Sequence, residues 1–136
     1  MPLSVYPDPP SGVVLCIDDN QDVLECERVF LESFGYTVLT ACSGGIGLEL
    51  ASVHSIDVIV LDYFMPTMNG QEVAMEMRRL RPQTPIILLT ETVNVPQPTL
   101  KLVDALVTKN CLASQLLTTI AHLYGCGRVP PHSYDA

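Results

Sequence analysis

Short apolar runs alternate along this chain with more polar segments in which apolar residues recur at helical spacing. The runs are nearly continuous in apolar residues, as in "VVLCI" at 13–17, which is typical of β-strands covered on both faces. Strands are therefore predicted at 13–17, 36–41, 57–61, 85–90 and 105–108.

The segments between these runs predict helices. The first helix is expected to begin after Asn20, a residue type that favours helix N-caps, and to end at Gly35. Its expected inward face consists of Val23, Cys26, Phe30 and Phe34. Further helices are expected at 45–53, where nearby glycines weaken the pattern, at 70–80 and at 111–124.

One connection is interrupted by prolines. A helix is expected between the last two strands, but Pro96 and Pro98 break its pattern. The helix predicted there is short or displaced, and it starts near Thr99.

Alternating strands and helices predict an α/β fold: a doubly wound, five-stranded parallel sheet with helices on both faces, flavodoxin-like in size. The domain is expected to span residues 12–124. Residues 1–11 are rich in proline and are expected to form a flexible tail, and residues 125–136 a second tail or a truncated linker.

Composition and charge narrow the class of function. The 136 residues include 15 acidic and 7 basic ones, for a net charge of -8, which argues against nucleic-acid binding. The cluster of Arg78, Arg79 and Arg81 is expected at a helix end, where cations are favoured. Five cysteines without a CxxC pair, no signal peptide and no membrane-length apolar run predict a cytoplasmic protein with no membrane contact.

Polar residues end four of the five predicted strands. Asp18 and Asp19 follow the first strand, Asp62 the third, Thr90 the fourth and Lys109 the fifth. Because parallel strands place their carboxyl ends at one edge of the sheet, these side chains are expected to converge. Taken singly, each also has an ordinary structural role: a helix cap or turn for aspartate, a strand end for threonine and a solvated cation for lysine.

Together, these residues predict a phosphoryl-transfer site. Three converging carboxylates repel one another, and one would take up a proton unless a cation compensates. Carboxylate oxygens suit Mg²⁺, while a lysine and a hydroxyl can hold phosphoryl oxygens around a nucleophilic carboxylate.

The segments "VLCIDDN", "VIVLDYFMPTMNG", "PIILLT" and "VTK" together resemble those of a response-regulator receiver domain of two-component signalling. The resemblance implies that Asp62 is the phosphoacceptor and that Asp19 binds Mg²⁺ directly. It further implies that Asp18 acts on the metal through water, that the Phe64 backbone carbonyl is another ligand, and that Thr90 and Lys109 bind the phosphoryl group.

The resemblance also implies the partners. A histidine kinase or phosphotransfer protein would donate the phosphoryl group, and a downstream protein or a fused output domain would read the change. Such a domain is a regulatory phosphoacceptor and not an enzyme, apart from its own phosphorylation and dephosphorylation. In the loop after Asp62, Pro66 is expected to stiffen the turn and Gly70 to permit close packing or an unusual φ.

Three positions depart from the family pattern. Leu106 stands where a switching aromatic residue is common, and Asn110 stands where proline is usual, which predicts a trans bond and an altered placement of Lys109. Glu91 replaces a small residue, and it either narrows access to the phosphoryl site or points to solvent.

Three hypotheses follow. The first is a phosphoacceptor switch in which phosphorylation of Asp62 alters partner binding. The second is a pseudo-receiver, a protein-interaction module in which phosphorylation no longer controls output. The third, an aspartate-nucleophile phosphatase, is disfavoured because Phe64 occupies the place of its second acid.

Overall fold

The computed structural model describes residues 12–65, 69–91, 94–109 and 113–126. Pro66 and Asn110, for which the sequence predicts a stiff turn and a trans bond, lie outside these ranges.

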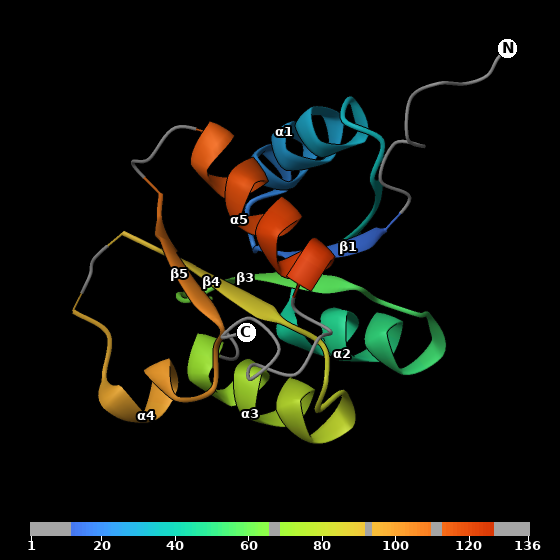
Figure 1. Ribbon diagram of the computed structural model, residues 1–136. Helices are drawn as coiled ribbons and strands as arrows, with labels where there is room; N and C mark the ends of the chain where they lie inside the picture. The colour runs from blue at the N-terminus through green and yellow to red at the C-terminus, as the bar shows by residue number, and fades with distance from the viewer. Residues whose placement is uncertain (1–11, 66–68, 92–93, 110–112, 127–136) are drawn as a thin grey trace, which may run out of the picture.

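A parallel sheet of five strands forms the centre of the molecule (Figure 1). The strands lie in the order β2-β1-β3-β4-β5, and every neighbouring pair is parallel. Their bounds are Val13–Ile17 (β1), Thr37–Ala41 (β2), Val58–Asp62 (β3), Ile86–Thr90 (β4) and Ala105–Thr108 (β5). The predicted doubly wound α/β fold is confirmed.

Helices cover both faces of the sheet, with α1 and α5 on one face and α2 and α3 on the other (Figure 1). Their bounds are Gln21–Glu32 (α1), Gly44–Val53 (α2), Gly70–Leu80 (α3), Gln97–Leu100 (α4) and Ala113–Cys126 (α5). The side chains of Asn20, Ser43 and Asn69 accept backbone N–H groups at the starts of the first three helices. These caps fix where each chain segment leaves the sheet edge.

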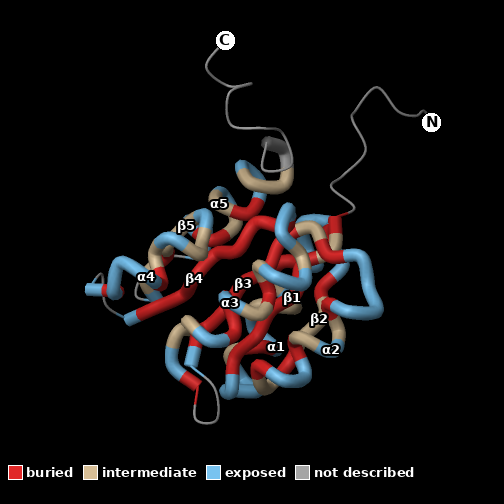
Figure 2. Tube along the Cα trace, turned by 90° about the horizontal axis from the view of Figure 1, so that it is seen from below, coloured by how far each residue is buried: buried red, intermediate tan, exposed pale blue. Residues whose placement is uncertain are grey.

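The core lies in two layers, one on each side of the sheet. Val14, Cys16 and Ile87 face the layer beneath α1 and α5, whereas Leu15, Ile59 and Leu88 face the layer beneath α2 and α3. Figure 2 shows the central strands buried along their length. This alternation within apolar strands is the reason that both faces need a helical cover.

The expected inward face of α1 is right only in part: Val23 and Phe30 are partly buried, and Phe30 packs against the core. Leu24 and Leu31 are buried, whereas Cys26 is exposed and Phe34, which lies beyond the end of the helix, is 46% exposed. The buried face is therefore displaced around the helix from the predicted one. As a result, Glu27 turns toward the interior, between the two buried leucines.

The fourth helix is short, as predicted, but it starts before the predicted position near Thr99. α4 begins at Gln97, so Pro98 lies inside its first turn. Proline is tolerated there because the first backbone N–H groups of a helix have no partner within it. Thr99 is fully buried and donates a hydrogen bond from its hydroxyl to Gln71 Oε1 at 2.6 Å, which ties α4 to α3.

Arg78 joins the end of α3 to the loop before β5. Its guanidinium donates to the carbonyl oxygens of Pro82, Thr84 and Leu102 and pairs with Asp104 at 2.8 Å. Arg79 pairs with Glu76, and Arg81 donates to two carbonyl oxygens at the end of α2. The three arginines thus act at a helix end, as the sequence predicts.

Among the residues that the structure describes, no helix is both long and apolar enough to cross a bilayer.

Candidate functional site

A cavity of about 420 Å³ opens at the carboxyl ends of β1 and β3. Its lining consists of Asp18, Asp19, Asn20, Val23, Asp62, Phe64, Glu91 and Lys109. The three aspartates and the lysine predicted from the strand ends therefore share one site. The fold brings them together because β1 and β3 are neighbours and parallel.

Lys109 bridges two buried carboxylates. Its Nζ lies 2.9 Å from Asp62 Oδ1 and 3.5 Å from Asp18 Oδ2. The side chains of Asp18 and Asp62 are 1% and 4% exposed, whereas that of Lys109 is 28% exposed. The backbone N–H of Lys109 donates to the Thr90 carbonyl at 2.8 Å, which fixes the lysine at the end of β5. Lys109 thus reaches Asp62 directly, and the altered placement expected from Asn110 stays a prediction.

One ammonium does not fully compensate two buried carboxylates. Burial raises the pKa of Asp62, and the nearby charge of Asp18 adds to this, although Lys109 and the Phe64 backbone pull the pKa down. Burial acts to lower the pKa of Lys109, but its pairing with Asp62 and Asp18 raises it overall. The site therefore holds a firmly protonated lysine and a phosphoacceptor candidate that would gain from a further cation.

The arrangement of the aspartates fits such a cation. Asp18, Asp19 and Asp62 each offer a carboxylate oxygen, and these oxygens lie within 4.8 Å of one another. Asp18 Oδ1 accepts the backbone N–H of Asn20 at 2.9 Å, but Oδ2 is buried without a hydrogen-bond partner. A buried oxygen left in this way, in an all-oxygen cluster, suits Mg²⁺. The division into direct binding by Asp19 and water-mediated binding by Asp18 stays a prediction.

Thr90 and Glu91 lie at the end of β4 but differ in environment. Thr90 is fully buried and is not among the described residues that line the cavity. Glu91 is exposed and does line it. Glu91 thus borders the cavity and is also open to solvent, so both placements left open for it stay predictions. The role of Thr90 in holding a phosphoryl group stays a prediction.

The loop after Asp62 depends on Gly70 for close packing. A Cβ at Gly70 would lie 2.7 Å from Tyr63 Cα, and the Gly70 N–H donates to the Tyr63 carbonyl. Close approach, and not an unusual φ, is thus the reason for glycine here, because Gly35 alone among the described residues has a positive φ. Phe64 is 60% exposed at the cavity rim.

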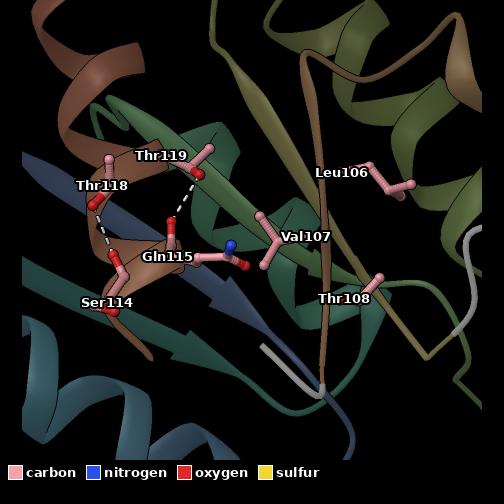
Figure 3. Close-up of a pocket in the computed structure, with 7 residues that line it drawn as sticks. All are labelled: Leu106, Val107, Thr108, Ser114, Gln115, Thr118 and Thr119. Carbon is pink, nitrogen blue, oxygen red and sulfur yellow. Dashed lines mark hydrogen bonds between the residues drawn. The ribbon is translucent and has the colours of Figure 1, made fainter. Parts of the chain in front are cut away.

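Leu106 lines a second cavity, but its side chain points away from Thr118 and Thr119, which lie on α5 (Figure 3). That cavity, of about 460 Å³, lies between β5 and α5, where the hydroxyls of Thr118 and Thr119 donate to backbone carbonyls one turn earlier. Leu106 itself is half-buried and packs against the α2 and α3 side of the core. An aliphatic side chain thus fills the place expected for a switching aromatic ring.

Glu27 is a charged residue near the site that the sequence did not single out. Burial, with a contribution from the charge of Asp18, raises its pKa to about 7, while a hydrogen bond with the Cys16 thiol and the charge of Lys109 act to lower it. Glu27 and Lys109 line a cavity of about 250 Å³ between α1 and α5. A correct inward face for α1 would have revealed it.

Solved structures similar to this chain include a chemotaxis protein and a response regulator protein. Chemotaxis protein CheY4 of Vibrio cholerae aligns with a TM-score of 0.77 at 28% identity, covering 83% of this chain and 98% of that protein. The response regulator protein TrrA of Thermotoga maritima, solved in complex with Mg²⁺-BeF, aligns with a TM-score of 0.78 at 28% identity and covers 82% of this chain and 98% of TrrA.

Sequence relatives are longer than this chain. The response regulator SaeR of Staphylococcus aureus and the probable transcriptional regulator ycf27 of Cyanidium caldarium are each 39% identical over 77 residues, or 57% of this chain. The match covers only 33% of SaeR and 30% of ycf27.

The family model described as "Response regulator receiver domain" matches residues 14–121. This range contains all the carboxylates of the cavity and all five strands, apart from the first residue of β1. By fold, site and sequence, the chain belongs to the response regulator receiver domains of two-component systems.

Proposed function

We propose that this chain is a phosphoacceptor switch that receives a phosphoryl group on Asp62 and changes its binding of a protein partner. The observation that carries the proposal is the contact of Lys109 Nζ with Asp62 Oδ1 at 2.9 Å, beside a buried oxygen of Asp18 that accepts no hydrogen bond. The receiver unit is proposed to span residues 12–124.

In the proposed reaction, a carboxylate oxygen of Asp62 attacks the phosphorus of a phosphohistidine on a histidine kinase or phosphotransfer protein. An O–P bond forms, the N–P bond breaks, and the imidazole of the donor leaves with the electron pair. Lys109 would pair with one phosphoryl oxygen, and Thr90 would donate a hydrogen bond to another. Attack of water on the aspartyl phosphate would later release inorganic phosphate and restore the carboxylate.

Asp18, Asp19, Asp62 and the Phe64 carbonyl would hold Mg²⁺. When bound, the ion would offset the negative charge that accumulates on the phosphoryl oxygens. Asp18 is suited to orient the ion or its water, because its Oδ1 is fixed by the Asn20 N–H while its Oδ2 accepts no hydrogen bond.

The substitution Asp62→Asn tests this function. With Mg²⁺ and acetyl phosphate, the wild-type chain is expected to gain the mass of one phosphoryl group, and D62N is expected to gain none because its amide is a poor nucleophile. Glu49→Gln, an exposed change on α2, serves as the control and should label like the wild type. Equal labelling of D62N and wild type, or no labelling of the wild type, would contradict the proposal.

The pseudo-receiver is the second candidate, and the aliphatic Leu106 favours it because no aromatic ring is there to report the state of the site. Partner affinity measured with and without phosphorylation separates the two. An unchanged affinity supports the pseudo-receiver, and a changed affinity supports the switch.

A further inference from the structure

Glu91 adds a fourth carboxylate to the cavity that contains Asp62. It follows Thr90 directly, so the end of β4 holds it at the same sheet edge as the three aspartates. Unlike Asp18 and Asp62, which are buried, Glu91 is exposed to solvent. A phosphodonor bound in this cavity therefore lies near this charge.

The charge of Glu91 is not offset by an ion pair within the part of the chain that the structure describes. Lys109 is the cation of the cavity, and it is taken up by Asp62 and Asp18. Arg28, Arg78 and Arg79 pair with carboxylates elsewhere. Glu91 therefore acts on an incoming ligand with its full negative charge, reduced only by solvent and salt.

The balance of charge in the cavity depends on this residue. With the four carboxyl groups ionised, one ammonium leaves a net negative charge that a single divalent cation does not cancel. Without Glu91, the same cation would bring the cavity to neutrality. The extra charge thus matters most for a ligand that is itself an anion.

From this placement we infer that Glu91 is a specificity-determining residue that selects phosphodonors by charge. It disfavours free dianionic acyl phosphates and admits donors in which a positive charge accompanies the phosphoryl group, as in the protonated nitrogen of phosphoramidate or the ring of a phosphohistidine. The inference rests on the proposed phosphorylation of Asp62 and names the class of donor for that reaction.

Two small donors of different charge test the inference. Acetyl phosphate is dianionic near neutral pH, whereas phosphoramidate is largely monoanionic because its nitrogen is protonated. Phosphorylation rates at saturating Mg²⁺ are measured by intact mass for wild type and Glu91→Gln. E91Q is expected to speed the reaction with acetyl phosphate about fivefold and that with phosphoramidate about twofold, since a unit charge acts in proportion to the donor charge.

Matched variants separate charge from size. Glu91→Asp keeps the charge and should stay close to the wild type with acetyl phosphate, whereas Glu91→Ala should behave like E91Q. Added salt should raise the wild-type rate with acetyl phosphate and reduce its difference from E91Q, because screening weakens the repulsion. Glu49→Gln, a charge removal outside the cavity, should leave the ratio of the two donor rates unchanged.

The outcomes are distinguishable. An equal effect of E91Q on both donors, or fast labelling of E91A beside slow labelling of E91Q, would overturn the inference while leaving phosphorylation of Asp62 intact. Failure of wild type and E91Q to label with either donor would instead overturn the proposed function, and the inference with it.

Discussion

Glu27 is half-buried, and its carboxyl group lies against Cys16 and apolar neighbours. This environment raises the pKa of Glu27, because the charged form loses hydration and lies near the charge of Asp18. The folded chain therefore binds a proton at Glu27 more tightly than the unfolded chain does. This advantage is complete below the unfolded value of 4.5 and is lost as the pH rises through about 7.

Glu27→Gln should reveal this dependence. The neutral amide keeps an oxygen that can accept the Cys16 thiol but carries no charge to desolvate. Without metal, E27Q is expected to match the wild type in free energy of unfolding near pH 4 and to exceed it by about 2 kcal/mol near pH 8. Urea denaturation at a series of pH values measures the difference, with Glu49→Gln as the exposed control. A constant difference across this range would show that Glu27 is not the titrating group.

For single residues, the charged side chains at the strand ends could be predicted, because an aspartate or lysine that follows an apolar run is visible in the sequence. Glu27 could not, because its role depends on which face of α1 turns inward. The predicted face included Cys26, which is exposed, while the buried Leu24 and Leu31 flank Glu27 instead. Helical spacing in the sequence does not distinguish two faces that differ by one residue position. Such a shift of the inward face nevertheless changes which side chains are most deeply buried.

Among the elements, α3 depends on a glycine at its first residue. Gly70→Ala would place a methyl group against the Tyr63 backbone, which cannot move without shifting the loop after Asp62. The change is expected to lower the free energy of unfolding by about 1–3 kcal/mol and to impair phosphorylation. Denaturant unfolding and labelling with acetyl phosphate provide the two measurements.

Gly45→Ala is the matched control in α2. A Cβ at Gly45 would meet no atom within 4 Å, and alanine favours a helix more than glycine does. Its expected effect is a stabilisation of about 0.5–1 kcal/mol. If both variants destabilise the protein equally, close packing at Gly70 is not what requires glycine there.

The position of α4 shows where local rules mislead. Two prolines suggested that the helix begins after them, yet α4 starts at Gln97 because proline fits a first turn. Strands and longer helices were predicted more closely, since their apolar patterns extend over more residues. A four-residue helix contains too few positions for such a pattern, and its ends are set by contacts such as Thr99 with Gln71.

For the whole molecule, the excess of buried negative charge links metal binding to stability. Mg²⁺ should bind the folded chain but not the unfolded one, because only folding brings Asp18, Asp19 and Asp62 together. At ten times its dissociation constant, Mg²⁺ is expected to add about 1.4 kcal/mol to the free energy of unfolding. Thermal unfolding at constant ionic strength measures this, and Asp19→Asn should require more Mg²⁺ for the same shift. A shift reproduced by Na⁺ alone would contradict specific binding.

The fold as a whole was predictable because five apolar runs and their connections allow few arrangements. The strand order, which makes β1 and β3 neighbours, follows from packing between elements far apart in the sequence. The link between the end of α3 and the loop before β5 also follows from such packing. There Arg78 binds carbonyl oxygens that no sequence pattern assigns to it.

Hydrogen bonds at the two ends of β5 also make its opening measurable. Near its start, the Ile86 N–H donates to Asp104 Oδ2 at an N···O distance of 2.8 Å, and the same oxygen pairs with Arg78. At the other end of β5, the amide hydrogen of Lys109 is bonded to the Thr90 carbonyl. The rates at which these two amide hydrogens exchange with deuterated solvent would therefore report separately how often each end of β5 opens. A comparison before and after phosphorylation of Asp62 would show whether one end or both become looser.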